Sequence, residues 1–528
     1  MLSTALRVAV ATSLVLILLR AASALYRKLR IARGLAPLSG PKGVFLLGNI
    51  PAFIRNRDRI YDFLEELLKT HGGRMKMPWH LFFDGAIYGC TLSDFLLDMQ
   101  ITDPADVKHI LSTNFANYVK PQGFIDAFKE VFEHSFFAMN HHGDAPDGGN
   151  KWRLQRKVAA AVFTTKNFRD FSERVFAKYA MDAVRTIESQ GNQCDMQELC
   201  AKYTLQSIFD VAFGLPLHDV ADDDEFAEHM GFVNEHCASR LFVKQHYKLL
   251  GWAMPSEYAL KRHTDAIRAV ADRILTRRLA EPASQLAARS DILSLFIQRA
   301  RDLDAASASL LDIPTLRSII LTFIFAGRDT TAECITYTFY AIARHPDVQQ
   351  KIVEELEKAA EGDDDTSGMT YETVKRFKYL EAVVLEAVRL YPALPFNVKH
   401  AVCDDYLPDG TFVPAGTDVV YSPWFMGRNN PIWGPDPLEF RPERWLEMPS
   451  RPSAFEFPAF QAGPRVCLGM NMAIIEAKLF VAVVLRRFHV RILPGEQQER
   501  GYTLKSGLFM SGGLPLQMTP RDEAALFS

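Results

Sequence analysis

The sequence predicts a mainly helical protein with a minor β region. Residues 195–305 read as successive amphipathic segments with apolar side chains at helical spacing, and residues 281–287 within them read as a flexible connection. Residues 314–344 form the longest uninterrupted helical segment, and a His-Pro pair closes it. The stretches 407–411 and 414–416 carry the glycine and proline residues of hairpin turns in a small sheet. These stretches together predict a helical frame supplemented by short strands.

Composition excludes several functional classes. The chain has 528 residues, 48% hydrophobic and 23% charged, and its length alone would suggest about three or four domains. A net charge of -3 without a long basic stripe argues against nucleic-acid binding. The 7 cysteines are scattered and include no Cys-x-x-Cys pair. This pattern argues against a disulfide framework or a zinc site, and it favours a reducing compartment.

The N-terminal segment is expected to anchor the protein in a membrane. Residues 8–26 reach spanning length if Arg20, near one end, turns its charge to the interface. A basic cluster at residues 27–33 follows and would stay on the cytoplasmic side. The turn-rich stretch 37–43 then predicts a stiff hinge between the anchor and the body.

A cleaved signal peptide is the alternative for this segment. Residues 8–19 alone are too short to span a bilayer, and Ala22-Ser-Ala24 could serve as a cleavage site. An uncleaved anchor is favoured because a secreted body with an unpaired reactive thiol would be poorly placed. The expected division is therefore an anchor with its basic stop at residues 1–33 and a body at residues 34–528.

Residues 460–469 place one cysteine in a loop of turn-forming residues, directly before a helix expected from residue 470 to 488. Arg465 brings a positive charge close to the Cys467 sulfur, and Gly469 leaves room for a flat group. The N–H groups at a helix N-terminus favour a thiolate over a thiol. Haem iron is among the few soft metals that take a lone cysteine, whereas a buried structural cysteine is the alternative.

A polar break interrupts the long helix of residues 314–344. Residues 318–326 are apolar on nearly every side, so this helix should run through the interior. The break Ala-Gly-Arg-Asp-Thr-Thr follows at residues 326–331, and buried acid and hydroxyl groups cost stability unless they are satisfied. The threonine hydroxyl could simply bond back to the preceding turn. In the functional interpretation, Gly327 lets a ligand approach while Asp329 and Thr330 relay protons.

Two residue pairs at helical spacing do not by themselves indicate a functional site. Trp152 and Arg156 lie at i,i+4 spacing on one helix, which alone indicates a cation–π or surface pair. Glu386 and Arg389 lie at i,i+3 spacing, which alone indicates a weak surface salt bridge.

The pattern Phe-x-x-Gly-x-Arg-x-Cys-x-Gly at residues 460–469 resembles the haem-binding loop of the cytochrome P-450 family. The break at 326–331 is similar to the family's oxygen-activating segment Ala-Gly-x-Asp-Thr-Thr. The motifs follow the family's order from Trp152 to the turn near Leu508, so the resemblance spans nearly the whole body. It implies the cytochrome P-450 fold, a single large domain, instead of the several domains that length suggests.

The resemblance also implies site residues. Cys467 would be the axial ligand of the haem iron, Thr330 would hydrogen-bond dioxygen, and Asp329 would connect it to solvent. Glu386, Arg389 and Arg444 would form a charge network under the loop that serves folding and haem retention. Lys399 stands where the family usually has a propionate-binding arginine, which leaves open whether Lys399, His400 or both make that contact. The other residues expected to bind haem are Trp152, Arg156, Ala326, Gly327, Phe460, Arg465 and Gly469.

The substrate pocket is expected to include Phe323, Phe396, Leu508 and Phe509. The turn 506–513 carries Leu508 to Met510 at its tip, which resembles the family's second wall of the pocket. An exposed apolar turn is the alternative. Segments 397–402, 404–416 and 426–428 look like the plant and microbial fatty-acid ω-hydroxylase branch.

The implied reaction is hydroxylation of a long-chain hydrophobic substrate, at the terminal carbon of a fatty acid, with O2 and haem b. The sequence carries no glycine fingerprint for flavin or nicotinamide, so NADPH would act only through a membrane flavoprotein reductase, with cytochrome b5 as a further candidate partner. The implied location is the endoplasmic reticulum membrane, with a single-pass anchor and the body facing the cytosol. The alternatives are oxidation of alkanes, sterols or xenobiotics, a reductase-independent isomerase or dehydratase of lipid hydroperoxides, and a non-catalytic haem- or lipid-binding protein.

Overall fold

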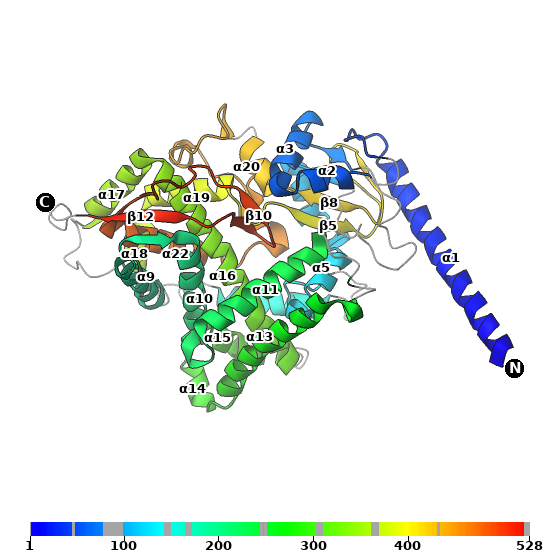
Figure 1. Ribbon diagram of the computed structural model, residues 1–528, viewed down its shortest axis with the longest axis horizontal. Coiled ribbons are helices and arrows are strands. Elements are labelled where there is room, and N and C mark those ends of the chain that lie inside the picture. Colours follow the sequence, from blue (N-terminus) through cyan, green and yellow to red (C-terminus); the bar gives the residue numbers. More distant parts are fainter. Residues whose placement is uncertain are drawn as a thin grey trace. The chain divides into compact units, whose positions relative to one another are not determined.

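Helices make up most of the described chain, which confirms the mainly helical prediction (Figure 1). The computed structural model describes residues 2–44, 48–77, 99–141, 149–163, 172–242, 247, 251–302, 310–360, 369–429 and 433–521. The chain divides into two units by its contacts. The first unit comprises residues 1–129, 234–262 and 396–422, and the second comprises residues 130–233, 263–395 and 423–528.

The first unit contains the N-terminal helix and a mixed sheet with the order β1-β2-β8-β5-β3, in which only β2 and β8 run parallel. A separate hairpin pairs β6 with β7 around the turn expected at 407–411. Its elements are α1 (Leu2–Gly34), α2 (Ile50–Arg55), α3 (Ile60–Thr70), α4 (Pro104–Lys108), α5 (Gln122–Ala127), β1 (Met75–Lys76), β2 (Met99–Ile101), β3 (Tyr118–Val119), β5 (Asn397–Ala401), β6 (Asp405–Tyr406), β7 (Phe412–Val413) and β8 (Asp418–Tyr421).

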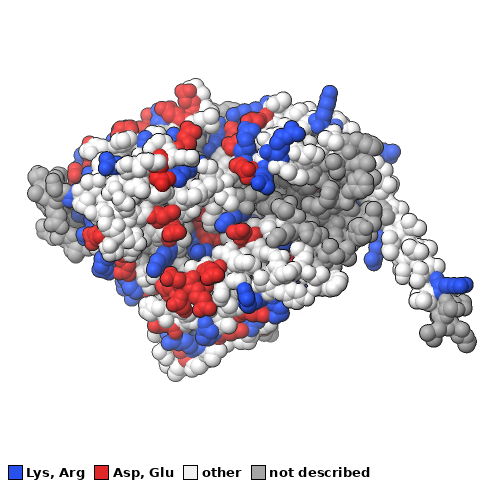
Figure 2. All heavy atoms as spheres, viewed as in Figure 1, with Lys and Arg blue, Asp and Glu red and all other residues white. Residues whose placement is uncertain are grey.

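Helix α1 is long and apolar enough to cross a membrane over residues 6–34, and most of its surface is uncharged (Figure 2). Its last turn packs against the β6–β7 hairpin. Ile31 is buried with its side chain beside Gly416, and Arg30 forms an ion pair with Asp404. Any side chain at Gly34 would collide with Pro414.

The stretch expected to be a hinge is tied to the first unit. Leu35 is buried, and the backbone N–H of Lys76 donates to the carbonyl oxygen of Ser39 at 2.9 Å. The turn composition of residues 37–43 does describe irregular backbone, but it does not make this segment a free spacer. The buried apolar side chains on both sides of Gly34 hold it in place.

The second unit contains the remaining helices and two small antiparallel sheets, β4-β12-β9 and β10-β11. Helices α6 (Lys129–Phe132), α11 (Asp223–Phe242) and α13 (Pro255–Leu279) have residues in both units. The elements of the second unit are α7 (Asn150–Val162), α9 (Ala177–Ser189), α10 (Met196–Phe213), α14 (Ala283–Ala287), α15 (Ile292–Arg301), α16 (Ile313–Arg344), α17 (Pro346–Ala360), α18 (Tyr371–Arg376), α19 (Lys378–Leu390), α20 (Pro423–Asn429), α21 (Arg444–Glu447), α22 (Met470–Arg487), β4 (Gln193–Asp195), β9 (Phe488–Ile492), β10 (Tyr502–Leu504), β11 (Leu508–Met510) and β12 (Pro515–Pro520).

Helix α16 is the central element of the second unit. It begins one residue before the predicted start, where the Asp312 side chain accepts a hydrogen bond from the Thr315 N–H at 2.7 Å and caps the helix. It ends at Arg344, as predicted. Its side chains are buried along most of its length because apolar residues occupy nearly every side. Helix α10 packs against it along an extended contact (Figure 1).

Two connections differ from the sequence expectation. The stretch 281–287 reads as a flexible connection, but α14 forms there because Leu286 is buried and its carbonyl oxygen accepts from Gln298 Nε2 at 2.7 Å. The stretch 506–513 reads as one turn, but residues 508–510 form β11, which pairs with β10. Leu508 and Met510 are both buried, which excludes an exposed apolar turn.

Candidate functional site

The loop around Cys467 is closed by its own backbone. The N–H of Cys467 donates to the carbonyl oxygen of Phe460 at 2.8 Å, and the N–H of Val466 donates to Gly463 at 3.0 Å. Helix α22 starts at Met470, directly after Gly469. The loop therefore presents the cysteine sulfur at a helix N-terminus, as the sequence predicted.

The thiol of Cys467 experiences opposing influences. Its surroundings desolvate it and raise its pKa, whereas backbone N–H groups of Gly469 and Met470 and the Arg156 charge act in the lowering direction. Desolvation is the largest of these, so the pKa lies above its ordinary value. The residue nevertheless keeps an exposed surface. A soft cation at the sulfur would therefore be needed to make the thiolate the favoured form.

Phe163 links this loop to helix α16, and sequence reasoning missed it. A Cβ atom at Gly469 would lie 4.0 Å from the Cys467 sulfur and 3.9 Å from the Phe163 ring. The Phe163 ring in turn lies 5.8 Å, between centroids, from that of Phe323 on α16. Phe163 directly follows α7, and only its place after the helix that carries Trp152 could have drawn attention to it.

Arg156 holds the loop from the side. Its Nε donates to the carbonyl oxygen of Pro464 at 3.1 Å, and its Nη2 donates to that of Val466. Burial lowers the pKa of Arg156, and the neighbouring Cys467 opposes that shift. Arg156 thus braces the backbone on both sides of Arg465.

Arg465 contacts the segment that precedes α7 and the Trp152 ring on α7. Its Nη2 donates to the carbonyl oxygen of Met139 at 2.7 Å, and its guanidinium carbon lies 4.7 Å from the centroid of the Trp152 ring. Burial, and then the nearby charge of Arg156, lower its pKa to about 9. The structure therefore brings Trp152, Arg156, Arg465 and Cys467 together.

The polar break in α16 is open on one side. Ala326 is exposed, although the helix around it is buried. The Thr330 hydroxyl donates to the carbonyl oxygen of Ala326 at 2.7 Å, and Arg328 Nη1 donates to Asp329 at 2.9 Å. The bond from Thr330 to the preceding turn is the structural alternative weighed from the sequence, and it is present here.

Gly327 is required by packing against α10. A Cβ atom there would come within 2.7 Å of the Ile208 side chain. One turn closer to the start of α10, the Thr204 hydroxyl donates to the carbonyl oxygen of Arg328 at 3.0 Å. Helix α10 therefore supports the break from behind.

A buried charge network lies elsewhere in the second unit. Arg389 donates from Nε and Nη2 to the two carboxylate oxygens of Glu386 at 2.8 Å each. Arg444 Nε donates to the same carboxylate at 2.8 Å. Trp445 Nε1 donates to Glu386 at 2.9 Å, and its ring lies 5.2 Å from that of Phe457, three residues before the cysteine loop. The structure thus joins the three residues that the sequence predicted to act together.

Three further predicted residues belong to the first unit. Lys399 and His400 lie on β5, where Lys399 is buried and His400 Nδ1 contacts Asp418 at 2.7 Å. The Phe396 ring lies 5.9 Å from that of Tyr61. Their roles toward the group that Cys467 would bind stay predictions.

The hairpin expected to form the second wall of the pocket carries one charge. Leu508 is buried, whereas Phe509 is only partly buried. The Lys505 ammonium lies 5.3 Å from the centroid of the Phe509 ring. A cation held over an aromatic face at the tip gives this wall a polar end.

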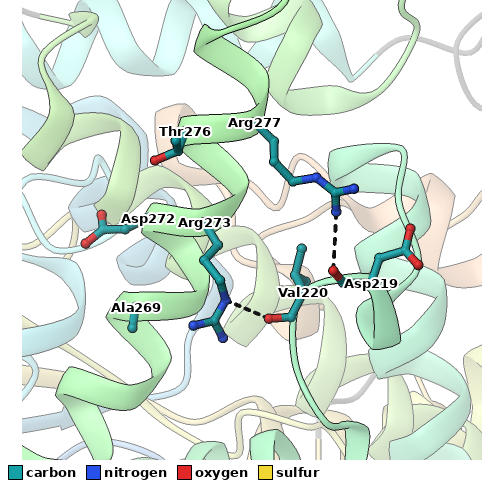
Figure 3. Close-up of a pocket in the computed structure, with 7 residues that line it drawn as sticks. All are labelled: Asp219, Val220, Ala269, Asp272, Arg273, Thr276 and Arg277. Atoms are coloured by element: carbon teal, nitrogen blue, oxygen red, sulfur yellow. Dashed lines mark hydrogen bonds between the residues drawn. The ribbon is translucent and has the colours of Figure 1, made fainter.

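One surface recess has no part in this site. It measures about 540 Å³ and lies between α13 and residues 219–220 (Figure 3). Arg273 Nε donates to the carbonyl oxygen of Val220 at 2.7 Å, and Arg277 donates to that of Asp219 at 3.3 Å. Both arginines of α13 therefore bind the turn at residues 219–220 that lines the recess. None of its lining residues is a predicted site residue.

The donor set around Cys467 fits a haem. Arg156 and Arg465 have no carboxylate partner among the described residues, and the buried Nε of Arg465 donates to no acceptor there. Two desolvated positive charges call for an anion, and the two propionates of haem supply it. The thiol offers a soft iron ligand, and Gly469 leaves a flat approach to it. The fold and the site together define the class of haem-thiolate proteins.

Comparison with known proteins identifies the family. A model of the cytochrome P-450 family matches residues 38–518. Cytochrome P-450 704B1 of Arabidopsis thaliana is 32% identical over 531 residues, which cover 92% of this chain and 95% of that protein. Cytochrome P-450 CYP94D109 of Paris polyphylla is 32% identical over 444 residues, covering 80% and 85%. Cytochrome P-450 94C1 of Arabidopsis thaliana is 33% identical over 457 residues, covering 82% and 87%.

The chain therefore belongs to the cytochrome P-450 family, and it is a monooxygenase with a haem-thiolate cofactor. Membership also implies a separate electron donor. This finding excludes the non-catalytic binding protein that the sequence left open.

Proposed function

We propose that this monooxygenase hydroxylates the terminal carbon of a long-chain fatty acid. One oxygen atom of O2 enters the terminal C–H bond, and the other leaves as water after uptake of two electrons and two protons. The segments 397–402, 404–416 and 426–428, which resemble the fatty-acid ω-hydroxylase branch, support this substrate class.

The observation that carries the proposal is that phenylalanine rings pack on two different sides of α16, directly before its polar break. Ring centroids of Phe132 lie 5.5 Å from Phe325 and 4.8 Å from Phe137, and Phe163 meets Phe323 at 5.8 Å. These rings offer no charged or hydrogen-bonding atom, so they suit a hydrocarbon chain better than a polar substrate.

Haem b is the proposed cofactor, and when bound it activates dioxygen. Cys467 would ligate its iron, while Trp152, Arg156 and Arg465 would bind the propionates, with Lys399 or His400 as a further contact. Ala326 and Gly469 would leave space for the flat ring, and Phe460 would pack against it. Gly327 stays a predicted contact, although the space of its missing side chain is filled by Ile208 of α10. The charge network of Glu386, Arg389 and Arg444 would hold the loop in place from its other side.

Thr330 and Asp329 would deliver protons. The single hydroxyl proton of Thr330 is directed to the Ala326 carbonyl, and rotation about the Cβ–Oγ bond redirects it toward a bound ligand. Asp329 is held by Arg328 and can exchange that contact for water. The chain's contribution is therefore a movable proton at one atom and an acid one residue away.

Thr338 provides a matched control for this role. Its hydroxyl donates to the Cys334 carbonyl at 2.7 Å, the same back-bond as that of Thr330, but it is fully buried. Thr330→Ala should lower the hydroxylated product formed per O2 consumed by about tenfold or more, with the balance released as peroxide. Thr338→Ala should leave that ratio unchanged. Equal ratios in both variants would remove Thr330 from the proposal.

The membrane arrangement is also part of the proposal. Helix α1 supports a single-pass anchor at residues 1–33, with the catalytic body at residues 34–528 facing the cytosol from the endoplasmic reticulum. Electrons would come from NADPH through a membrane flavoprotein reductase, with cytochrome b5 as a second donor.

The decisive experiment uses the full-length protein in lipid nanodiscs with a reductase. Saturated fatty acids of increasing length are titrated while the spin-state shift of the haem is followed, and the products are identified by mass spectrometry. Terminal hydroxylation that requires NADPH and O2 is expected. If only sterols or alkanes gave hydroxylated products, the fatty-acid substrate would be wrong and one of those classes would take its place. Turnover of a lipid hydroperoxide without reductase would instead identify an isomerase or dehydratase.

A further inference from the structure

His141 is buried beside the cysteine loop and was not among the predicted site residues. Only 3% of its surface is exposed. Its Nδ1 lies 3.1 Å from Nη2 of Arg465, and its ring centroid lies 5.4 Å from that of Trp152. His141, Trp152 and Arg465 therefore form one contact group.

The partner of His141 fixes its tautomer. An arginine guanidinium donates hydrogen bonds and cannot accept them, so Nδ1 of His141 must be the acceptor. The proton of the neutral ring then resides on Nε2, which becomes a donor. Arg465 thus determines which ring nitrogen of His141 donates a hydrogen bond.

The charges around this group favour a neutral imidazole. Arg156 and Arg465 already place two positive charges here without a carboxylate among the described residues. A third cation would be repelled by both. A neutral imidazole accepts the hydrogen bond from Arg465 without adding a third charge.

Helix α7 holds the segment that carries His141. Gln155, fully buried on α7, accepts from the Phe136 N–H at 2.6 Å and donates from Nε2 to the His134 carbonyl oxygen at 2.7 Å. Gly149 has a φ of 75°, and a side chain there would collide with the carbonyl oxygen of His141. The start of α7 and His141 are therefore fixed relative to each other.

We propose that His141 is a positioning residue for the anionic edge of the haem. Through Nδ1 it orients Arg465, whose guanidinium would bind a propionate. The inference depends on the proposed placement of the propionates, and it assigns to His141 a role in retaining the haem and not in the reaction.

The test measures haem loss from the full-length holoenzyme to excess apomyoglobin. His141→Phe keeps an aromatic ring beside Trp152 but removes both nitrogens, and it should accelerate haem loss about tenfold, as expected for a lost hydrogen bond to a charged group. His141→Gln restores an acceptor for Arg465 and a donor beside it, so it should lose haem within about threefold of the wild-type rate. His134→Phe, in the same segment but half exposed, is the matched control and should not change the rate.

The outcomes separate this inference from the proposed function. The ferrous carbon monoxide spectrum should keep the thiolate signature in all three variants, because Cys467 is untouched. Wild-type haem loss in His141→Phe, or acceleration in His141→Gln equal to that in His141→Phe, would overturn the role of His141. Failure to hydroxylate fatty acids would overturn the substrate proposal and leave the pattern of haem loss intact.

Discussion

Two pairs of arginines in the second unit are built into opposite environments. Arg389 and Arg444 share the carboxylate of Glu386, and all three side chains are buried. Arg156 and Arg465 contact backbone carbonyls and an imidazole, with no carboxylate among the described residues. The first pair is neutralised by the chain itself, whereas the second pair retains positive charge that a bound anion can neutralise. The presence or absence of one carboxylate thus separates a structural charge cluster from a ligand-binding one.

The largest effect is expected from Glu386→Gln. The substitution leaves two buried guanidiniums without a carboxylate, which should cost about 3–5 kcal/mol of unfolding free energy. Urea unfolding followed by circular dichroism measures this loss. Glu447→Gln breaks the exposed pair with Arg441, and it should cost at most about 1 kcal/mol. Equal losses in the two variants would erase the distinction between the clusters.

Substituting one arginine from each pair should separate effects on folding from effects on ligand binding. Arg156→Met removes a charge that the apoprotein does not compensate, so apoprotein stability should stay unchanged or rise. Haem loss should accelerate about 10–100-fold, because a charge-assisted contact is worth about 1.5–3 kcal/mol. Arg389→Met should instead destabilise the apoprotein. The measurements are urea unfolding of the apoprotein and haem transfer to apomyoglobin, and a shared loss of apoprotein stability would contradict the comparison.

A third buried carboxyl group is not held by an arginine pair. Glu333 on α16 is buried, and its Oε2 has no hydrogen-bond partner among the described residues. Burial, and then the Asp329 charge, raise its pKa well above the ordinary value, while Lys505 and Arg328 act in the opposite direction. This carboxyl group therefore gives up its charge, whereas Glu386 forms ion pairs.

The pH dependence of stability tests that contrast. The native state keeps the Glu333 proton that the unfolded state releases, so stability should fall as pH rises from the ordinary glutamate pKa toward the raised one. The slope for one such group is about 1.4 kcal/mol per pH unit. Glu333→Gln should flatten the slope of the unfolding free energy against pH, measured by urea unfolding between about pH 5 and pH 7. Glu476 on α22 is also buried with a raised pKa, so the double variant should be flattest. Unchanged slopes would show that Glu333 is ionised in the folded state.

The smallest effect is expected from an exposed pair in the first unit. Arg30 and Asp404 join α1 to the β6–β7 hairpin, and both side chains are more than a third exposed. Asp404→Asn should therefore change the unfolding free energy by less than about 1 kcal/mol. A loss as large as that of Glu386→Gln would show that exposure does not decide the strength of these pairs.

Local sequence patterns predicted what local contacts determine. Helix α16 was predicted to within one residue because its apolar surface and the His-Pro pair that closes it lie in the helix or next to it. The i,i+3 spacing predicted that Glu386 and Arg389 pair but indicated a surface salt bridge, whereas the pair is buried; the participation of Arg444 followed only from the family resemblance. The proximity of Arg465 to Cys467 was predictable because both residues lie in one short loop.

The missed residues act over long sequence separations. His141 contacts Arg465, which lies 324 residues later in the sequence, and the folded chain places Phe163 beside Gly469. No periodicity or spacing connects such residues before the chain is folded. The stretch 281–287 was misjudged for a related reason, because the burial of Leu286 outweighs the turn-forming composition of that stretch.

The docking of α1 has a practical consequence for preparing a soluble form of the enzyme. Residues 6–20 and 22–25 are mostly exposed and apolar, whereas Ile31 and Leu35 are buried. Removing residues 1–25 would discard most of the apolar stretch and keep those two side chains. Cutting after Gly34 would uncover Phe412 and Pro414 and create an aggregation-prone face on the truncated protein.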